Sequence, residues 1–256
     1  MHIRALRCFG ARPGQGNPAL VVEGAAPDPD ARQALARARA TTCVFLDEAD
    51  GIVRLDFVYP HARSPLCLHA TLAAAAVLFA RRPGAATIAV ETAMTGQALA
   101  LSRAGDDYFV RLVPQAAPAP ALAAGQVQAM LGAAPVSAPR TASVGSPKLL
   151  VELADADALY GLAPDLAAIA AWGRQHGVNG IYAWCRRADG DFEGRNFNHL
   201  DPALEDAATG VAAGALGVAL GCGLVLRQGR AVGRDCLIRT RLEDGTVLVG
   251  GAAAEA

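Results

Sequence analysis

The sequence predicts an α+β protein made of two pseudo-symmetric half-barrels, each a curled, mainly antiparallel sheet around a central apolar helix. Two observations lead to this prediction. Short strand-like runs recur along both halves of the 256-residue chain, and each half holds one helix-like segment, at 67–80 and at 206–222, made almost wholly of apolar and small residues. A helix that is apolar on every side must be covered on every side. A sheet curled around it provides that cover.

The first half alternates strand-like runs with two helical segments. Strands are expected at 2–9, 17–24, 41–48, 51–60, 86–93, 97–104 and 107–114. In the fourth run, Leu55, Phe57 and Tyr59 occupy every second position, which suits a half-buried strand. An amphipathic helix is expected at 31–40, and the apolar helix follows the fourth strand.

The second half repeats this scheme after a connection rich in Pro and Ala at 115–125. We expect helices near 126–132, 164–176 and 206–222, strands at 140–145, 148–155 and 180–187, and a final hairpin at 235–251. The hairpin turns at Asp244-Gly245, a dipeptide typical of two-residue turns. The predicted domains are therefore 1–117 and 118–256, with a last strand that could cross back to the first half.

Composition and short motifs narrow the function. Charged residues make up 18% of the chain and the formal net charge is −1, so neither a nucleic acid nor a membrane is expected as partner. Without a signal-like N-terminus or an uninterrupted spanning run, a cytoplasmic protein is expected. The six cysteines form no CxxC pair and the histidines have no ligand spacing, so disulfides and metal are not expected. The glycines of "GARPGQGNP" do not open a helix, so no nucleotide cofactor is expected.

The two apolar helices can be aligned with each other. Placing "CLHATLAAAA" over "TGVAAGALGV" sets Leu68-His69 over Gly210-Val211, a weak internal repeat. Both segments begin at a turn-like stretch and continue into small residues that permit close packing. Two helix N-termini with free N–H groups that face one point would form a carboxylate site.

Five segments in the same order resemble the PhzF family of phenazine-biosynthesis isomerases and their homologues. They are "GNPALVV" (16–22), "DFVYPHARSPLCLHATLA" (56–73), "SVGSPKLLVEL" (143–153), "RNFNHLDPALEDAATGVAAGAL" (195–216) and "RQGRAVGRDCLIRT" (227–240). The resemblance spans nearly the whole chain and implies the diaminopimelate epimerase fold. It also implies a biosynthetic isomerase that acts on a small carboxylate substrate without cofactor or metal. A homodimer is our default expectation.

The resemblance also implies site residues. His69 and Asp206 would lie on opposite sides of an interdomain cleft, bind the substrate and relay protons. The substrate-binding residues would be Leu68, Ala70, Gly210, Val211 and Asn17. Read without the resemblance, His69 could be a core histidine, and Asp206 a helix cap or first-turn acid.

Several positions depart from the family pattern. Thr42 stands where the family has its catalytic glutamate, and we include it among the catalytic candidates. Val211 replaces a serine, Leu68 a glycine, Arg63 an acidic residue and Ala207 a proline. A threonine hydroxyl does not exchange protons with carbon near neutral pH without a strong neighbouring base. The pattern of losses favours a retuned, more apolar pocket over decay of the whole protein.

Other residues could replace the lost glutamate, and other functions stay open. Cys43, His61 and His199 are the candidate bases, although a buried or surface role suits each better. Cys67 is expected to be a small buried filler, and Arg63 could attract a second anionic group or be solvated. Glu205 is expected to be structural. The alternatives to an isomerase are a lyase, dehydratase or cyclase that orients a reactive substrate, and a non-catalytic homologue that binds small acids.

Overall fold

The computed structural model describes residues 1–198 and 205–256. The chain divides into two compact units. One unit is Met1–Arg111 together with Gly250–Ala256, and the other is Leu112–Val249. His199 and the neighbouring residues up to 204 lie outside the described residues.

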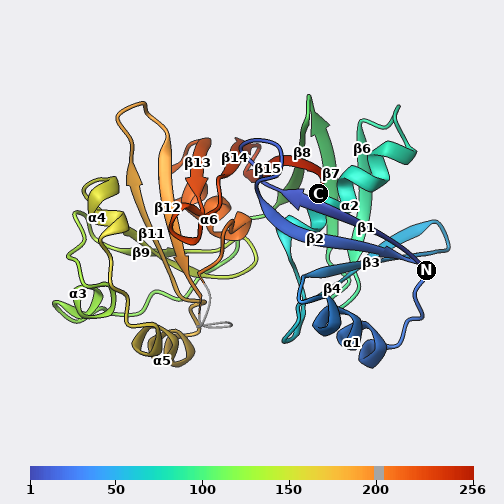
Figure 1. Ribbon diagram of the computed structural model, residues 1–256. Coiled ribbons are helices and arrows are strands. Elements are labelled where there is room, and N and C mark those ends of the chain that lie inside the picture. Colours follow the sequence, from blue (N-terminus) through green and yellow to red (C-terminus); the bar gives the residue numbers. More distant parts are fainter. Residues whose placement is uncertain (199–204) are drawn as a thin grey trace. The chain divides into compact units, whose positions relative to one another are not determined.

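The first unit is a closed barrel of eight strands (Figure 1). Its strands are β1 (His2–Cys8), β2 (Asn17–Glu23), β3 (Cys43–Ala49), β4 (Ile52–Val58), β6 (Thr87–Thr92), β7 (Ala98–Ala104), β8 (Asp107–Leu112) and β15 (Thr246–Glu255). They follow one another in that order, and β15 also pairs with β1, which closes the ring. The short β5 (Arg63–Ser64) pairs with β4 off this path. The helices are α1 (Pro29–Arg39) and α2 (Leu68–Arg81).

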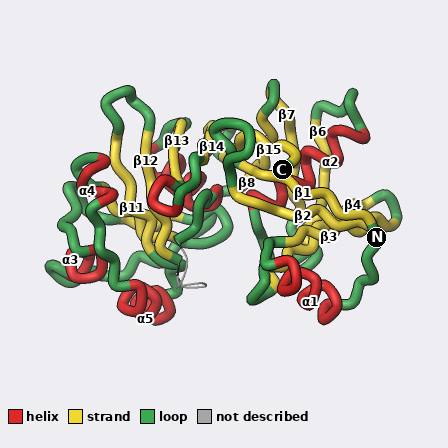
Figure 2. The backbone as a smooth tube through the Cα atoms, viewed as in Figure 1, coloured by secondary structure: helices red, strands yellow, loops and turns green. Residues whose placement is uncertain are grey.

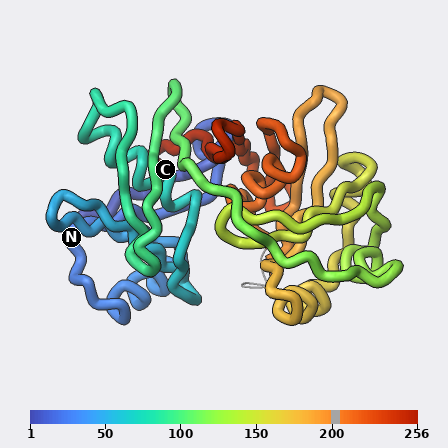
Figure 3. The backbone as a smooth tube through the Cα atoms, turned by 180° about the vertical axis from the view of Figure 1, so that it is seen from behind, coloured from blue at the N-terminus to red at the C-terminus, as the bar shows by residue number. Residues whose placement is uncertain are grey.

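The second unit carries a sheet with the order β9-β10-β11-β12-β13-β14, continued by the start of β15. Its strands are β9 (Arg140–Ala142), β10 (Lys148–Glu152), β11 (Ile181–Arg186), β12 (Phe192–Phe197), β13 (Leu224–Gln228) and β14 (Cys236–Glu243). Its helices are α3 (Gln126–Leu131), α4 (Ala156–Tyr160), α5 (Leu166–His176), α6 (Gly210–Leu220) and the short 3-10 turn Arg230–Val232. Figure 3 follows the chain from β8 through an extended segment into α3.

Each unit has one helix that the sheet covers, as the apolar patterning predicts. Helix α2 packs on β1, β2, β3, β4 and β7, and only a few residues in its last turns are more than slightly exposed. Helix α6 packs on β9, β10, β13 and β14. Helices α3, α4 and α5 lie together beside the strands of the second unit (Figure 2), where they cover the opposite sheet face through an apolar cluster.

The two units repeat one pairing pattern. In the first, β2 pairs parallel with β3 across α1, and β4 pairs parallel with β6 across α2. In the second, β10 pairs parallel with β11 across α4 and α5, and β12 pairs parallel with β13 across α6. Antiparallel pairs link the elements in the same order. The repeat extends to the sequence, because "GNPALVVE" (16–23) and "GSPKLLVE" (145–152) occupy β2 and β10 with their preceding turns. The α+β fold with its central helices is thereby confirmed.

Most expected elements occur, with several corrections, and the short strand β5 was not predicted. The helix expected over 206–222 begins only at Gly210, because Asp206 forms a β-bridge with Asn196. Strands β12 and β13 and helix α4 were not predicted. The sequence of β12, "FEGRNF", holds a glycine and two charges and gives no strand signal. The final hairpin turns at Asp244-Gly245 as expected, with φ of 48° and 74° in the left-handed region.

Candidate active site

His69 lies at the start of α2 and is held by side chains from two segments. Its ring is 7% exposed. The Nδ1 atom lies 3.4 Å from the Cys67 sulfur and 3.5 Å from the Asn17 amide nitrogen. The Tyr59 ring approaches edge-on, with its centroid 6.3 Å away. The structure thus brings together His69 and Asn17, two of the predicted site residues. Cys67 is buried, as expected, and it also contacts the histidine ring.

The "GNP" motif positions Asn17 beside the histidine. Gly16 has φ 109°, and a Cβ at this position would lie 2.6 Å from the backbone oxygen of Cys8. Only glycine fits such a close approach. The tight turn lets Asn17 begin β2 opposite Cys8, and its side chain then reaches His69.

The N-terminus of α2 has no side-chain cap. The N-cap residue, Cys67, makes no capping hydrogen bond, and its backbone oxygen accepts from the N–H of Thr71. The N–H groups of Leu68, His69 and Ala70 precede the first position with an intrahelical acceptor. Helices α1, α4 and α5 differ, because an aspartate accepts a hydrogen bond at each of their N-termini. An uncapped helix end favours binding of an anion.

Thr42 and Cys43 lie at the start of β3, beside β2. Thr42 is 8% exposed, and its backbone oxygen accepts from the Leu20 N–H. Burial raises the pKa of the Cys43 thiol to about 11, which keeps it protonated near neutral pH. Cys43 is therefore a poor replacement for a carboxylate base.

Arg63 and His61 have structural contacts. The Arg63 Nε donates to Asp56 Oδ1 at 2.6 Å, and the buried Asp56 also accepts from Arg32. The Arg63 charge, which we expected to be solvated or to attract the substrate, is thus paired within the protein. His61 is exposed and stacks on Tyr59 with a centroid separation of 5.5 Å.

Asp206 lies just before α6 in the second unit, and both its carboxylate and its backbone oxygen accept hydrogen bonds. Its Oδ2 accepts from the Thr209 hydroxyl at 2.7 Å, and its backbone oxygen accepts from Gln228 Nε2 at 2.7 Å. The Thr209 oxygen accepts from Gln228 Nε2 at 3.0 Å rather than from a backbone N–H of α6, so α6 also lacks a side-chain cap. The N–H groups of Gly210 and Val211 therefore lie at an uncapped end. Asp206 is not itself the helix cap.

Glu205 is structural, as expected. Its two carboxylate oxygens accept from Arg195 at 3.0 and 2.8 Å, and both side chains are largely buried. This pair fixes the segment that leads to Asp206.

Sequence reasoning missed three polar residues near Asp206. Lys148 is completely buried, and its Nζ donates to the backbone oxygen of Asn179 at 2.5 Å. The buried Tyr182 hydroxyl donates to Gln228 Oε1 at 3.0 Å. One sequence signal pointed to this cluster, since Lys148 is the only lysine of the chain.

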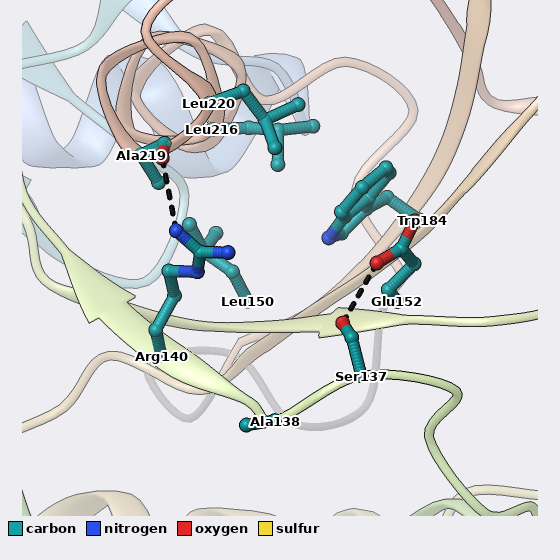
Figure 4. Close-up of a pocket in the computed structure, with 9 residues that line it drawn as sticks. All are labelled: Ser137, Ala138, Arg140, Leu150, Glu152, Trp184, Leu216, Ala219 and Leu220. Atoms are coloured by element: carbon teal, nitrogen blue, oxygen red, sulfur yellow. Dashed lines mark hydrogen bonds between the residues drawn. The ribbon is translucent and has the colours of Figure 1, made fainter.

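A pocket lies in the second unit at the other end of α6 (Figure 4). It is lined by residues that include Leu216, Ala219 and Leu220 of α6, and by Trp184. Ala219 is nine residues beyond Gly210, about 13 Å at 1.5 Å per residue. Three of the polar side chains drawn there are paired internally, Arg140 with a backbone oxygen of α6 and Ser137 with Glu152. The pocket is therefore separate from the candidate residues.

The sequence matches the phenazine biosynthesis-like protein family, PhzC-PhzF, over residues 6–256. The chain belongs to this family. An uncharacterized isomerase of Deinococcus radiodurans is 32% identical to it, over 96% of this chain and 90% of that protein. The uncharacterized isomerase YddE of Escherichia coli is 30% identical, over 90% and 86% of the two chains.

Solved structures agree with this assignment to the PhzC-PhzF family. A predicted epimerase from Pseudomonas aeruginosa is similar with a TM-score of 0.78 and 27% identity, over 99% of this chain and 98% of that one. A PhzF-family protein of Enterococcus faecalis has the same fold, with a TM-score of 0.81 at 22% identity, over 99% and 95% of the two chains. The fold is the diaminopimelate epimerase-like fold that the resemblance implied. Within the described residues, no helix is both long and apolar enough to cross a membrane.

Proposed function

We propose that this PhzC-PhzF protein is an isomerase that moves a proton on a small carboxylic acid, without an organic cofactor or metal. The observation that carries the proposal is shared by both units. Each central helix begins without a side-chain cap and has a titratable side chain at that end, His69 on α2 and Asp206 before α6. The isomerase and epimerase names of the relatives support the same reaction class.

In this reaction the helix ends bind the substrate and the two side chains move the proton. N–H groups of Leu68 and Ala70 in one unit, and of Gly210 and Val211 in the other, hold carboxylate oxygens. We place the substrate in a cleft between the two halves, as the family resemblance implies. His69 and Asp206 take the proton from one carbon and return it to another.

The surroundings of His69 support its role as a proton carrier. Asn17 and Cys67 both lie within hydrogen-bonding distance of its ring. Two contacts to Nδ1 restrain the orientation of the ring, which a proton transfer between fixed positions requires. Thr42 contributes at most a polar contact to the substrate, because its hydroxyl is a poor base.

Deuterium uptake tests the proposal. The protein is incubated in heavy water with a panel of amino acids and unsaturated cyclic or hydroxy acids, and the mass of each recovered compound is measured. We expect exchange at carbon that falls about 10²–10⁴-fold in His69→Ala and in Asp206→Asn. His176→Ala on α5 and Asp157→Asn on α4 are the matched controls and should retain the exchange rate.

Two other outcomes would change the assignment. Turnover without exchange would favour a lyase, dehydratase or cyclase, the class that Thr42 in place of a glutamate supports. Binding of several acids with neither exchange nor turnover would indicate a non-catalytic homologue. We also propose that the protein is a cytoplasmic homodimer with a biosynthetic role. The molar mass of the purified protein in solution, measured by light scattering, tests the dimer.

A further inference from the structure

Lys148 is an unusual residue in this chain. Every other basic side chain among the 23 lysines and arginines is an arginine, and this single lysine is 0% exposed. A fully buried ammonium group is costly unless it is paired. The one hydrogen bond described for its Nζ goes to the backbone oxygen of Asn179. A buried arginine could not lose its charge, whereas a lysine can.

The internal repeat shows that the fold does not require an amine at this position. In the aligned segments "GNPALVVE" and "GSPKLLVE", Lys148 corresponds to Ala19, which is 1% exposed. The strand registers agree, because Leu20 pairs with Cys43 in one unit and Leu149 with Ile181 in the other. Alanine therefore packs the same site in the first unit.

The neighbours of Lys148 differ between the units in the same way. The register aligns Tyr182 with Val44, and Asn196 with Phe57. Apolar residues of the first unit are thus replaced by polar ones in the second. The difference is confined to one side of the sheet, since the alternate residues Leu149, Ile181 and Phe197 join the apolar cluster on the other side.

These polar residues share one sheet face with Asp206. Lys148 and Leu150 lie on one face of β10, and Leu150 is in register with Tyr182. Tyr182 pairs with Asn196, and Asn196 forms the β-bridge with Asp206. Paired residues of neighbouring strands point to the same face. The Asn196 amide is fully buried, and neither of its polar atoms has a hydrogen-bond partner in the described structure. Such a group needs a hydrogen-bond partner, which an ordered water or a polar substrate group would supply.

The charge that acts on Lys148 comes from Asp206. The pKa of the Lys148 ammonium is lowered to about 7. Burial lowers the pKa, and the charge of Asp206 offsets part of that effect. Burial raises the pKa of Tyr182 well above 10, and it raises the pKa of Cys236 on β14 to about 12. Both groups therefore stay neutral near pH 7. Helix α6 has no titratable side chain.

The remaining charged groups on this face lie at the far end of β10. Glu152 is four residues along the strand from Lys148, about 13 Å at 3.3 Å per residue. It accepts from Ser137 and forms an ion pair with Arg186 of β11 at 3.9 Å, and the neighbouring Arg140 donates to the Ala219 oxygen. Among the described residues, Asp206 is the charged group that acts on Lys148.

We propose that Lys148 is a positioning residue for proton transfer at Asp206. Its ammonium group stabilises negative charge at the N-terminus of α6, and loss of its proton removes that stabilisation. This inference rests on the proposed function, because it gives Asp206 its role in the reaction. Lys148 acts through Asp206 and orders the polar groups around it.

Nuclear magnetic resonance tests the pairing without any substrate. The full-length protein is grown with ¹³C,¹⁵N-lysine. The carbon next to the amine of the single lysine gives one signal, and its chemical shift is followed from pH 5 to 10. We expect a midpoint near the value of about 7. In Asp206→Asn the midpoint should fall by about one pH unit, the usual effect of losing a nearby opposite charge. Asp157→Asn is the matched control and should leave it unchanged. A midpoint near 10, or one unaffected by Asp206→Asn, would overturn the pairing.

The pH profile of deuterium exchange tests the consequence for the reaction. With wild type, we expect exchange to fall as the pH rises through about 7, because the ammonium is lost. Lys148→Arg, which keeps its charge, should lose this fall and retain exchange on the alkaline side. Lys148→Met should exchange slowly at every pH. A fall that persists in both variants would refute the positioning role.

The two experiments separate failure of the inference from failure of the proposed function. If the lysine signal behaves as expected and no compound exchanges, the isomerase proposal fails, but the electrostatic coupling of Lys148 to Asp206 is still supported. If exchange depends on Asp206 but its pH dependence is the same in wild type and in the Lys148 variants, the isomerase proposal stands and the positioning role is wrong. If Lys148→Arg does not fold, the wild-type titration and the pH profile of Lys148→Met still test the positioning role.

Discussion

Replacement of Lys148 by methionine should change how the stability of the protein depends on pH. The lysine pKa is lowered from 10.5 to about 7 in the folded chain. Between these two values the unfolded chain binds more protons than the folded chain. The free energy of unfolding of the wild type therefore rises with pH across this window. Stability that is present above pH 10.5 is lost as the pH falls toward 7.

The size of the effect follows from the two pKa values. The interval between 10.5 and about 7 corresponds to a free energy on the order of 5 kcal/mol at 1.36 kcal/mol per unit. Lys148→Met has a similar length and no charge, so it lacks this penalty. We expect its stability advantage over the wild type to be largest near pH 7. The advantage should shrink by at most about 1.4 kcal/mol per pH unit on going to pH 10.

Urea unfolding at pH 7, 8, 9 and 10 measures this difference. Contributions from all other groups are common to the two proteins and cancel when the two are compared. Arg174→Met removes an exposed charge from α5 and should differ from wild type by the same amount at every pH. A pH-independent difference between Lys148→Met and wild type would refute the buried-charge reasoning.

Three further substitutions test the packing. Gly214→Ala should destabilise the protein by about 1 kcal/mol, because the added carbon would lie only 2.8 and 2.9 Å from two buried valine methyls. This overpacking outweighs the higher helix propensity of alanine. A higher urea midpoint in the variant would contradict this. Arg32→Met should cost about 3–5 kcal/mol in urea unfolding, since the 3% exposed Asp56 loses a partner, and a neutral result would show that Arg63 suffices. Ala40→Gly should raise the thermal midpoint by relieving a left-handed φ of 47°, a gain of about 1 kcal/mol; a lower midpoint would mean that the cap is not strained.

Much of the fold was predictable because its signals are local. The strands of the first half alternate or form short apolar runs, and α2 and α6 stand out by composition. The strand β12 escaped prediction because "FEGRNF" gains its burial only from the strands and helices packed on it. The late start of α6 was missed for a similar reason, since the bridge between Asp206 and Asn196 joins residues ten positions apart.

The candidate site was predictable in part, through motifs. His69 and Asn17 were named from the sequence, and the structure brings them within 3.5 Å. The contact of His69 with Cys67 depends on the turn that starts α2, which the sequence does not specify. Arg63 was misjudged because its partner, Asp56, becomes a neighbour only when β5 pairs with β4.

The sequence alone determined the two buried helices, the residues at their tips and the family. These features depend on composition, periodicity and ordered motifs. Only the tertiary structure revealed the surroundings of Lys148. Tyr182, Asn196 and Asp206, which share its sheet face, come from three later segments, and parallel pairing of β10 with β11 across two helices places them on that face. A lysine in an apolar run has no local signal for such partners, because desolvation and charge are properties of the folded surroundings.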